Sequence, residues 1–329
     1  MLLIITNEAD IHPNPVIDLL IKKNLPYFRL NTDKLLTDYN VSYEISNDKV
    51  FFEISYKDHP IKINSDQITC AWERRPMEPL ATYDHFEDEK VKETILNEGD
   101  GFLRFFRYAL EDVYWIGHPI NERKAGSKIL QKIIARKLNF SIPKTLFSND
   151  FKKIENFNSQ QVAIKPIAAS DLNLRDKYYV FYTRKKSIEE IKKLGENSFR
   201  NNINFLEEYI QKYTEIRITV IDDLCLSAKI DSQTLDKESG KIDWRQGYDH
   251  GIKFIKTEVP KEIEVKCLQF LKYFDLNFGC FDFIIDENEN YHFLECNTNG
   301  QWMWLEEEAD LKISEKLCEI FEREIKNSK

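Results

Sequence analysis

The chain is poor in glycine, and the motifs that depend on glycine are missing. Only 10 of its 329 residues are glycine, and the phosphate-binding pattern GxxxxGK[ST] does not occur. There is also no glycine-rich linker. The missing pattern excludes a P-loop nucleotide-binding protein. The length suits two or three compact units, or one intertwined enzyme.

Other absences bear on location and partners. The longest apolar runs fall far short of the ~20 residues that span a bilayer. The first ten residues, MLLIITNEAD, lack the basic segment and cleavage site of a signal peptide and are expected to form a strand. A net charge of −9 argues against non-specific binding to nucleic acid. We therefore expect a cytoplasmic protein with no membrane or nucleic-acid partner.

The six cysteines form no CxxC pair. Most lie in apolar strand or helix patterns, which favours buried, reduced thiols over disulfides or a zinc site. They are Cys70, Cys225, Cys267, Cys280, Cys296 and Cys318. A nucleophilic role for Cys296 is the weaker alternative, because the only histidine near it in sequence is His292.

Three oxygen-bearing side chains lie in a hairpin near the C-terminus. The polar turn 286–290 joins two apolar runs, which indicates paired strands. A loop at 287–290 places Asp282 opposite Glu295, and Asn297 shares a face with Glu295 because side chains alternate along a strand. Carboxylates and an amide oxygen at one patch suit Mg²⁺ carrying nucleotide phosphates.

The alternative is a set of solvated acids, which is expected for the turn residues Asp286, Glu287 and Glu289. Asp282 and Glu295 differ, because apolar residues flank them and carboxylates are seldom buried without a partner. From the residues alone, both interpretations stay open.

The pattern of elements indicates an α/β fold. A strand at 2–6, a helix from Pro13 to about Asn24 and a strand at 27–30 form a βαβ start, typical of a small doubly wound sheet. A long helical region is expected from about 84 to 114. Gly117-His118-Pro119 breaks that pattern and marks a domain boundary.

Further along the chain, 126–139 is expected to form an amphipathic helix with Ile129, Ile133 and Ile134 facing inward. Its first turn carries Lys128, and the strand that follows later ends in Lys165. Taken alone, a lysine at such a strand end is most often a charge at the sheet edge.

The stretch from Glu295 to Trp304, ECNTNGQWMW, together with Asp282, resembles the ATP-grasp enzymes. More narrowly, it resembles the microviridin-type or graspetide synthetases, which cross-link ribosomally made peptides. Cys296 and Thr298 replace the family's usual aliphatic residue and proline, but neither change removes a ligand. The resemblance covers about residues 70 to 306.

This resemblance implies an ATP-grasp fold with an N-terminal, doubly wound pre-ATP-grasp domain at 1–118. A central subdomain with a peptide-docking hairpin is expected at 119–204, and a C-terminal subdomain with the metal site at 205–329. Asp282, Glu295 and Asn297 would bind Mg²⁺. The residues expected to bind ATP are Lys128, Lys165, Glu207, Glu208, Tyr209, Ile210 and Glu215. The family's glycine-rich flap is replaced by IAASD at 167–171.

The resemblance also implies substrate residues. The family motif SQ…DWR matches Asp231-Ser232-Gln233 together with Asp243-Trp244-Arg245. The family motif WxRRP matches Trp72 to Pro76. Arg217, Arg245 and Lys229 are the expected catalytic residues. The two arginines are expected to grip the substrate carboxylate, because a guanidinium holds a carboxylate in fixed geometry, and Lys229 shares a face with Asp231. The expected substrate-binding residues are Arg74, Arg75, Asp231, Ser232 and Asp243, with Arg175, Tyr179 and Arg184 on the hairpin that receives the leader peptide. A plain surface pair is the alternative for Arg74 and Arg75.

The implied activity is ATP-dependent macrocyclisation of a precursor peptide. A Glu or Asp side chain would become an acyl phosphate, and a Ser or Thr hydroxyl or a Lys amine would displace the phosphate. One alternative is an ATP-grasp ligase that adds an amino acid to a protein or peptide. Another is a nucleotide-binding partner protein without turnover. A homodimer is expected by family resemblance, and no residue stands out as a general base.

Overall fold

The structure is a computed structural model, and it describes residues 1–48, 50–77, 87–168, 171–174 and 177–327. The chain begins with a parallel sheet in the order β2-β1-β6-β7. These strands are β2 (Tyr27–Asn31), β1 (Leu2–Thr6), β6 (Cys70–Glu73) and β7 (Tyr114–Trp115). Helix α1 (Pro13–Lys22) connects β1 to β2, so the expected βαβ start is confirmed. Proline at its first position suits this helix, because an N-terminal N–H has no partner there.

An antiparallel sheet extends the N-terminal unit. It consists of β3 (Tyr39–Ile45), β4 (Val50–Tyr56) and β5 (Lys62–Asn64). The short helix α2 (Leu35–Asp38) precedes it, and α3 (Glu89–Ala109) packs its Phe106 edge-on against Phe52. Helix α3 is shorter than expected: Asp88 caps its start, and Leu110 follows its last residue.

A second antiparallel sheet, in the order β12-β9-β13-β8, forms the central part of the chain. Its strands are β12 (Arg184–Ser187), β9 (Gln161–Lys165), β13 (Asn204–Glu208) and β8 (Thr145–Ser148). The short helices α6 (Lys152–Glu155), α7 (Ile188–Lys193) and α8 (Gly195–Arg200) accompany it. Strands β10 (Asp171–Leu174) and β11 (Lys177–Val180) pair only with each other among the described residues.

A five-stranded antiparallel sheet, in the order β16-β15-β14-β17-β18, carries the C-terminal part. Its strands are β16 (Phe254–Thr257), β15 (Leu224–Ile230), β14 (Thr214–Ile221), β17 (Phe278–Ile285) and β18 (Tyr291–Asn297). Helices α9 (Glu238–Ile242), α10 (Lys261–Tyr273) and α11 (Met303–Ala309) belong to this part. Asp282 is the register partner of Glu295, and a bulge follows Asp282. The predicted opposition of these two carboxylates is therefore confirmed.

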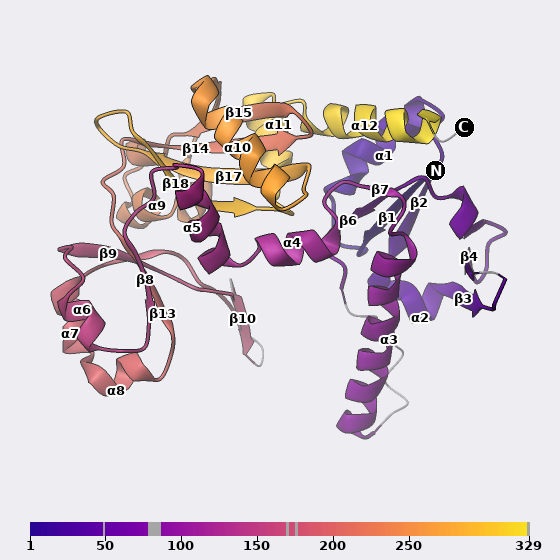
Figure 1. Cartoon of the computed structure of the whole chain (residues 1–329), viewed down its shortest axis with the longest axis horizontal. Helices are drawn as coiled ribbons and strands as arrows, with labels where there is room; N and C mark the ends of the chain where they lie inside the picture. The colour runs from indigo at the N-terminus through magenta and orange to yellow at the C-terminus, as the bar shows by residue number, and fades with distance from the viewer. Residues whose placement is uncertain (49, 78–86, 169–170, 175–176, 328–329) are drawn as a thin grey trace.

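The two helices α4 (Pro119–Ala125) and α5 (Lys128–Lys137) join the N-terminal unit to the remainder (Figure 1). In α5, Ile134 is buried as expected, but Ile129 and Ile133 are each 47% exposed. The inward positions are taken instead by Gln131 and Lys132, whose polar ends have partners inside the protein.

The last helix returns to the beginning of the chain. Helix α12 (Ile313–Asn327) lies beside α1, and both are at the same end of the molecule in Figure 1. One apolar cluster includes Leu20 of α1, Trp72 of β6, Phe321 of α12, and Trp302, which caps the start of α11. The N-terminal unit therefore shares a core with the C-terminal part. Among the described residues, no helix is both long and apolar enough to cross a membrane.

Candidate functional site

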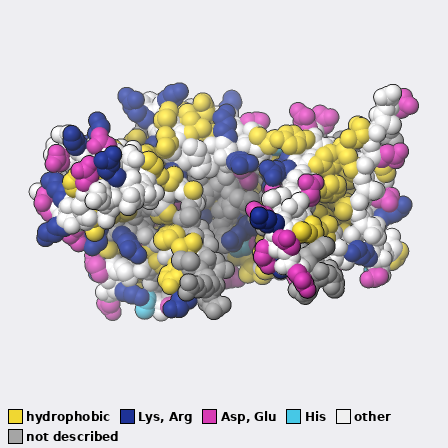
Figure 2. Space-filling model, turned by 90° about the horizontal axis from the view of Figure 1, so that it is seen from below, with side chains coloured by type: hydrophobic (Ala, Val, Ile, Leu, Met, Phe, Trp, Pro, Cys, Tyr) yellow, Lys and Arg dark blue, Asp and Glu magenta, His cyan; other side chains and the backbone are white. Residues whose placement is uncertain are grey.

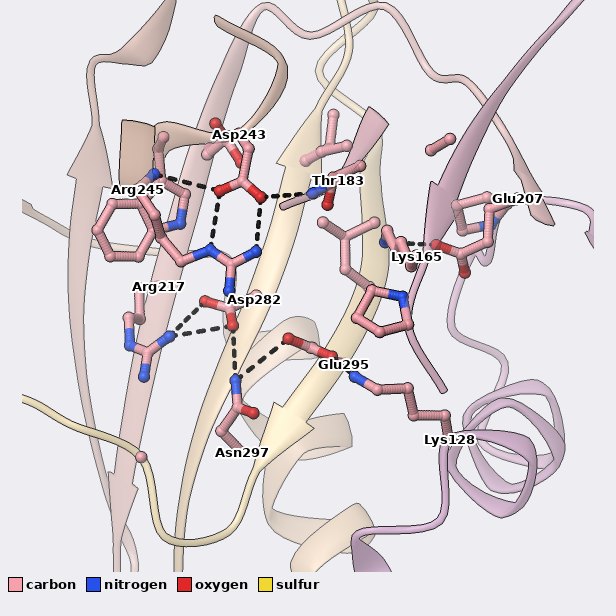
Figure 3. A pocket seen from close by; sticks show the side chains of 18 of the residues that line it. Lys128, Lys165, Thr183, Glu207, Arg217, Asp243, Arg245, Asp282, Glu295 and Asn297 are labelled. Atoms are coloured by element: carbon pink, nitrogen blue, oxygen red, sulfur yellow. Dashed lines mark hydrogen bonds and ion pairs between the residues drawn. The ribbon is translucent and has the colours of Figure 1, made fainter. Parts of the chain in front are cut away.

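A cleft of about 900 Å³ lies where the central sheet, the C-terminal sheet and helix α5 meet. Most of the predicted site residues line it, and Figure 3 shows how their side chains converge. The predicted residues in the cleft wall are Arg75, Lys128, Lys165, Glu207, Glu208, Tyr209, Ile210, Glu215, Arg217, Asp243, Arg245, Asp282, Glu295 and Asn297.

The three predicted metal ligands come together at the floor of the cleft. The amide nitrogen of Asn297 lies 3.0 Å from Oδ2 of Asp282 and 3.4 Å from Oε1 of Glu295. A half-turn of the Asn297 amide presents its oxygen at the same place. No group of three or more His, Cys, Asp or Glu side chains within the described ranges is placed to hold a metal. The fit to a hard divalent cation therefore depends on Asn297 as well as the two carboxylates.

Basic side chains neutralise both carboxylates. Nη1 of Arg217 donates to the two oxygens of Asp282 over 2.8 and 3.0 Å, and Lys128 pairs with Glu295. Burial raises the pKa of Asp282, in spite of Arg217. Burial acts to raise the pKa of Glu295 too, but Lys128 and Lys165 outweigh it and hold that pKa well below its usual range.

Glu207 is held between two lysines. Its carboxylate is 2.5 Å from Nζ of Lys165 and 2.5 Å from Nζ of Lys132, and the residue is 1% exposed. Burial alone raises the pKa of Glu207, but the two ammonium groups overcome it and lower that pKa. Burial lowers the pKa of Lys132 to about 8. The Glu207 carboxylate is thus engaged inside the protein rather than left for an adenine ring, and Tyr209 and Ile210 line the cleft just beyond β13.

Sequence reasoning missed Lys132. Its signal is the spacing from Lys128, because residues four apart on a helix lie on one face. Lys128 is the first residue of α5, and Ser127 caps that helix. Gln131 fixes the helix to β18, since its side chain donates to the carbonyl of Cys296 and accepts from the N–H of Cys296.

Glu215 is held by two residues, of which Lys212 also lines the cleft. Its Oε1 accepts from the hydroxyl of Ser232 over 2.7 Å and lies 3.1 Å from Nζ of Lys212. Lys212, which sequence reasoning also missed, donates to the carbonyl of Ile242. Ser232 is 0% exposed, so the expectation that it binds substrate is wrong. It positions Glu215 instead.

Lys229 and Asp231 do not line the cleft. Lys229 is opposite Ile216 in the β14–β15 register, whereas Arg217 is opposite Ala228. Directly paired residues share a face of an antiparallel sheet, so Lys229 projects from the face opposite Arg217. Its closest charge partner is Asp231, at 3.9 Å. The structure contradicts a catalytic role for Lys229 and contact of Asp231 with substrate in the cleft.

Asp243 fixes Arg245 in the cleft. Its carboxylate accepts from Nε and Nη2 of Arg245 over 2.9 and 2.6 Å. The same carboxylate accepts from the N–H of Thr183, which precedes β12 of the central sheet. Figure 3 shows both interactions. Asp243 therefore positions Arg245 and connects the segment after α9 to the start of β12, rather than binding substrate directly.

The neighbours Arg74 and Arg75 have different environments. Arg74 is 0% exposed, donates to Asp10 and to the carbonyl of Gly300, and lies 4.5 Å above the ring of Trp302. The expectation that Arg74 binds substrate is therefore wrong. Arg75 has a φ of 47° and lines the cleft. A left-handed backbone at this residue allows one arginine to point inward and the next into the cleft.

Two of the residues predicted for leader binding, Tyr179 and Arg184, are not part of the cleft lining. Tyr179 is 47% exposed on β11, and Arg184 is exposed on β12. Arg175 lies outside the described residues.

Two antiparallel sheets enclose the cleft, which has lysines on one side and two carboxylates with an asparagine on the other. This arrangement defines a nucleotide-dependent ligase of the ATP-grasp class. Residues 1–123 match the description "MvdD pre-ATP grasp domain", and residues 125–321 match "RimK-like ATP-grasp domain". The chain belongs to the RimK-like ATP-grasp family. The predicted ATP-grasp fold with a pre-ATP-grasp domain is confirmed.

Known proteins with similar sequences and structures are ligases and macrocyclases. A tetrahydromethanopterin:alpha-L-glutamate ligase of Methanocaldococcus jannaschii is 24% identical, with 73% of this chain and 82% of the relative covered. A RiPP-associated ATP-grasp ligase of Chryseobacterium gregarium, in complex with ADP and a leader and core peptide, has a TM-score of 0.89 at 25% identity. That match covers 98% of this chain and 96% of the other.

The macrocyclase MdnC of Microcystis aeruginosa MRC, bound with precursor peptide MdnA, has a TM-score of 0.84. It is 25% identical over 98% of this chain and 99% of its own. These comparisons confirm that the chain is an ATP-grasp ligase and that its relatives include peptide-binding enzymes.

Proposed function

We propose that this ligase uses ATP to close rings in a ribosomally made precursor peptide. The observation that carries the proposal is the convergence of Lys165, Arg217 and the Asp282–Glu295 pair on one cleft. The full-length similarity to a macrocyclase and to a RiPP-associated ligase supports the peptide substrate.

The reaction has two steps. A Glu or Asp carboxylate of the peptide attacks the γ-phosphorus of ATP, the bond to the bridging oxygen breaks, and ADP leaves. A Ser or Thr hydroxyl, or a Lys amine, of the same peptide then attacks the acyl carbon, loses its proton and expels phosphate. Each ring therefore consumes one ATP, and the peptide loses one water. Ester formation in water is unfavourable, which is why the reaction is coupled to ATP.

The residues of the cleft divide between the two substrates. Lys128 and Lys165 bind phosphates as point charges, and the segment 208–210 with Glu215 faces the nucleoside. Asp282, Glu295 and Asn297 would hold Mg²⁺, which would supply positive charge to the phosphates. Arg217 stabilises the reacting phosphoryl group, because its guanidinium is fixed beside Asp282. Arg245, held by Asp243, grips the carboxylate of the peptide.

The strand β12 and the hairpin β10–β11 are the proposed dock for the leader peptide. Leu172, Tyr179, Val180 and Phe181 are each at least 36% exposed, and Arg184 lies nearby on an edge strand. An extended peptide adds to an exposed strand edge through main-chain hydrogen bonds.

We also propose that the protein is cytoplasmic and forms a homodimer, and that its domains span residues 1–118, 119–204 and 205–329.

Mass spectrometry tests the proposal. Purified protein with ATP, Mg²⁺ and an acidic, hydroxyl-rich precursor peptide should yield peptide lighter by one water per ring, together with ADP. Glu295→Gln should abolish both products, whereas Glu287→Gln, an exposed residue in the turn of the same hairpin, should leave them unchanged. Steady release of ADP without dehydration of any acidic precursor would contradict the proposal.

A second candidate is the addition of an amino acid to a peptide or protein. The similarity to a glutamate ligase of Methanocaldococcus jannaschii is the observation in its favour. The same spectra separate the two activities, because addition of an amino acid increases the mass by one residue and ring closure decreases it by one water. A partner protein without turnover would release no ADP in either assay.

A further inference from the structure

The two carboxylates of the proposed cation site are neutralised by different basic side chains. Lys128 pairs with Glu295, and Arg217 forms two hydrogen bonds with Asp282. Both carboxylates are partly buried, since Glu295 is 31% exposed and Asp282 is 16% exposed. Figure 3 shows the ammonium group of Lys128 approaching Glu295 from the helix side of the cleft. A free divalent cation would therefore meet an ammonium group at one of its ligands.

The two glutamates of the cleft differ in how many lysines they have. Glu207 pairs with both Lys165 and Lys132. If Lys165 turns to a phosphate, Glu207 keeps Lys132. Among the described residues, Lys128 is the one lysine within ion-pair distance of Glu295, and Lys165 acts on it only from farther away. If Lys128 turns to a phosphate, Glu295 needs another cation, because a partly buried carboxylate without a counter-charge is costly.

The exchange needs only a side-chain movement. Helix α5 is fixed to β18 by the paired hydrogen bonds between Gln131 and the backbone of Cys296. Lys128 begins that helix, and its long flexible stem lets Nζ move while the backbone stays in place. Glu295 is the residue just before Cys296, so the helix and the ligand stay in register during the exchange.

We propose that Lys128 is a specificity-determining residue, which makes the cation site accept a divalent cation together with a nucleotide and reject the cation alone. Lys128 neutralises Glu295 until a phosphate draws its ammonium group away. The carboxylate then becomes available to the cation that accompanies that phosphate. This inference rests on the proposed ATP- and Mg²⁺-dependent function.

Binding of Mn²⁺, used as a paramagnetic substitute for Mg²⁺, tests the inference in the full-length protein without any peptide. Electron paramagnetic resonance would measure the dissociation constant with and without ADP. In the wild type, we expect ADP to tighten Mn²⁺ binding by at least about tenfold, a typical coupling between linked sites. In Lys128→Met, Mn²⁺ alone should bind about tenfold more tightly than in the wild type, and the effect of ADP should shrink.

Two further variants make the result specific. Lys137→Met removes an exposed lysine from the other end of α5 and should behave as the wild type. Lys128→Arg keeps a positive charge beside Glu295 and should keep Mn²⁺ binding weak without ADP; this variant also tests the inference if Lys128→Met does not fold. Equal or weaker binding of Mn²⁺ alone to a folded Lys128→Met would overturn the inference. Failure to dehydrate peptides, with the expected Mn²⁺ binding, would instead overturn only the proposed function.

Discussion

Arg74 donates a hydrogen bond to the carbonyl oxygen of Gly300 over 3.2 Å, although 226 positions separate the two residues. The next carbonyl, that of Gln301, accepts from Nη2 of Arg217 over 3.2 Å. One short loop therefore connects the N-terminal sheet to the arginine that contacts Asp282. The pre-ATP-grasp domain thus contributes directly to the geometry of the cleft.

Arg74→Met should destabilise the protein by about 3 kcal/mol, because it leaves the buried carboxylate of Asp10 without its cation. Chemical denaturation measures the change in the free energy of unfolding. Arg75→Met, at the exposed neighbour, should change that free energy by no more than about 0.5 kcal/mol. Equal costs for the two variants would contradict the different environments of these arginines.

The stabilisation by Asp10 should depend on pH. Burial tends to raise the pKa of this carboxyl, but hydrogen bonds from His12 and the charge of Arg74 hold it well below its usual range. The carboxylate therefore stabilises the fold fully above the unfolded pKa of about 3.9, and this contribution is lost as pH falls through the folded pKa. The stability difference between wild type and Asp10→Asn, measured by urea titration, should shrink below about pH 4.

Gly300→Ala should disrupt the site. A Cβ at this position would lie 2.6 Å from Sγ of Cys280 and 2.9 Å from Nη2 of Arg217. We expect a loss of about 1–3 kcal/mol in stability and about 100-fold in ring formation, because Arg217 must move. Gly101→Ala is the matched control: α3 has open space there, so stability should rise by up to about 1 kcal/mol with an unchanged rate.

Cysteine chemistry should be dispensable. Burial raises the pKa of Cys296 well above its usual value and that of Cys225 to about 11. At pH 8, iodoacetamide should label the native protein slowly, and mass spectrometry should find six labels only after unfolding in urea. Cys296→Ala should keep turnover. A folded Cys296→Ala that has lost activity would revive the nucleophile alternative.

Lys229→Met and Lys165→Met should behave differently in an assay of ADP release. Lys165 faces the cleft, so its loss should lower the rate by about 100-fold or more. Lys229 projects from the other side of the sheet and should be close to neutral. A large loss of rate in Lys229→Met, with unchanged KM for ATP, would indicate that the register argument is wrong.

The ligand hairpin was predictable because its determinants are local. Alternation along two apolar strands and a polar turn determine which side chains oppose each other, and the register confirmed Asp282 opposite Glu295. Lys128 and Lys165 were expected on motif resemblance, and both line the same cleft.

Partners that are distant in sequence were not predictable in the same way. Lys132 lies on a helix whose periodicity suggested that Ile129 and Ile133 were buried, yet the ion pair with Glu207 rotates polar residues inward. The inward turn of Arg74 depends on Asp10 and Gly300, from opposite ends of the chain. Lys229 was misplaced because one position along a strand reverses the face of the sheet.

The shared core of α1, β6 and α12 has a consequence for synthesis on the ribosome. Leu20 and Trp72, which belong to one apolar face, emerge long before Phe321, which packs on Trp72. Until then, part of that face has no cover. The first unit therefore completes its packing only after Phe321 has been translated, which exposes it to aggregation or chaperone binding in the meantime.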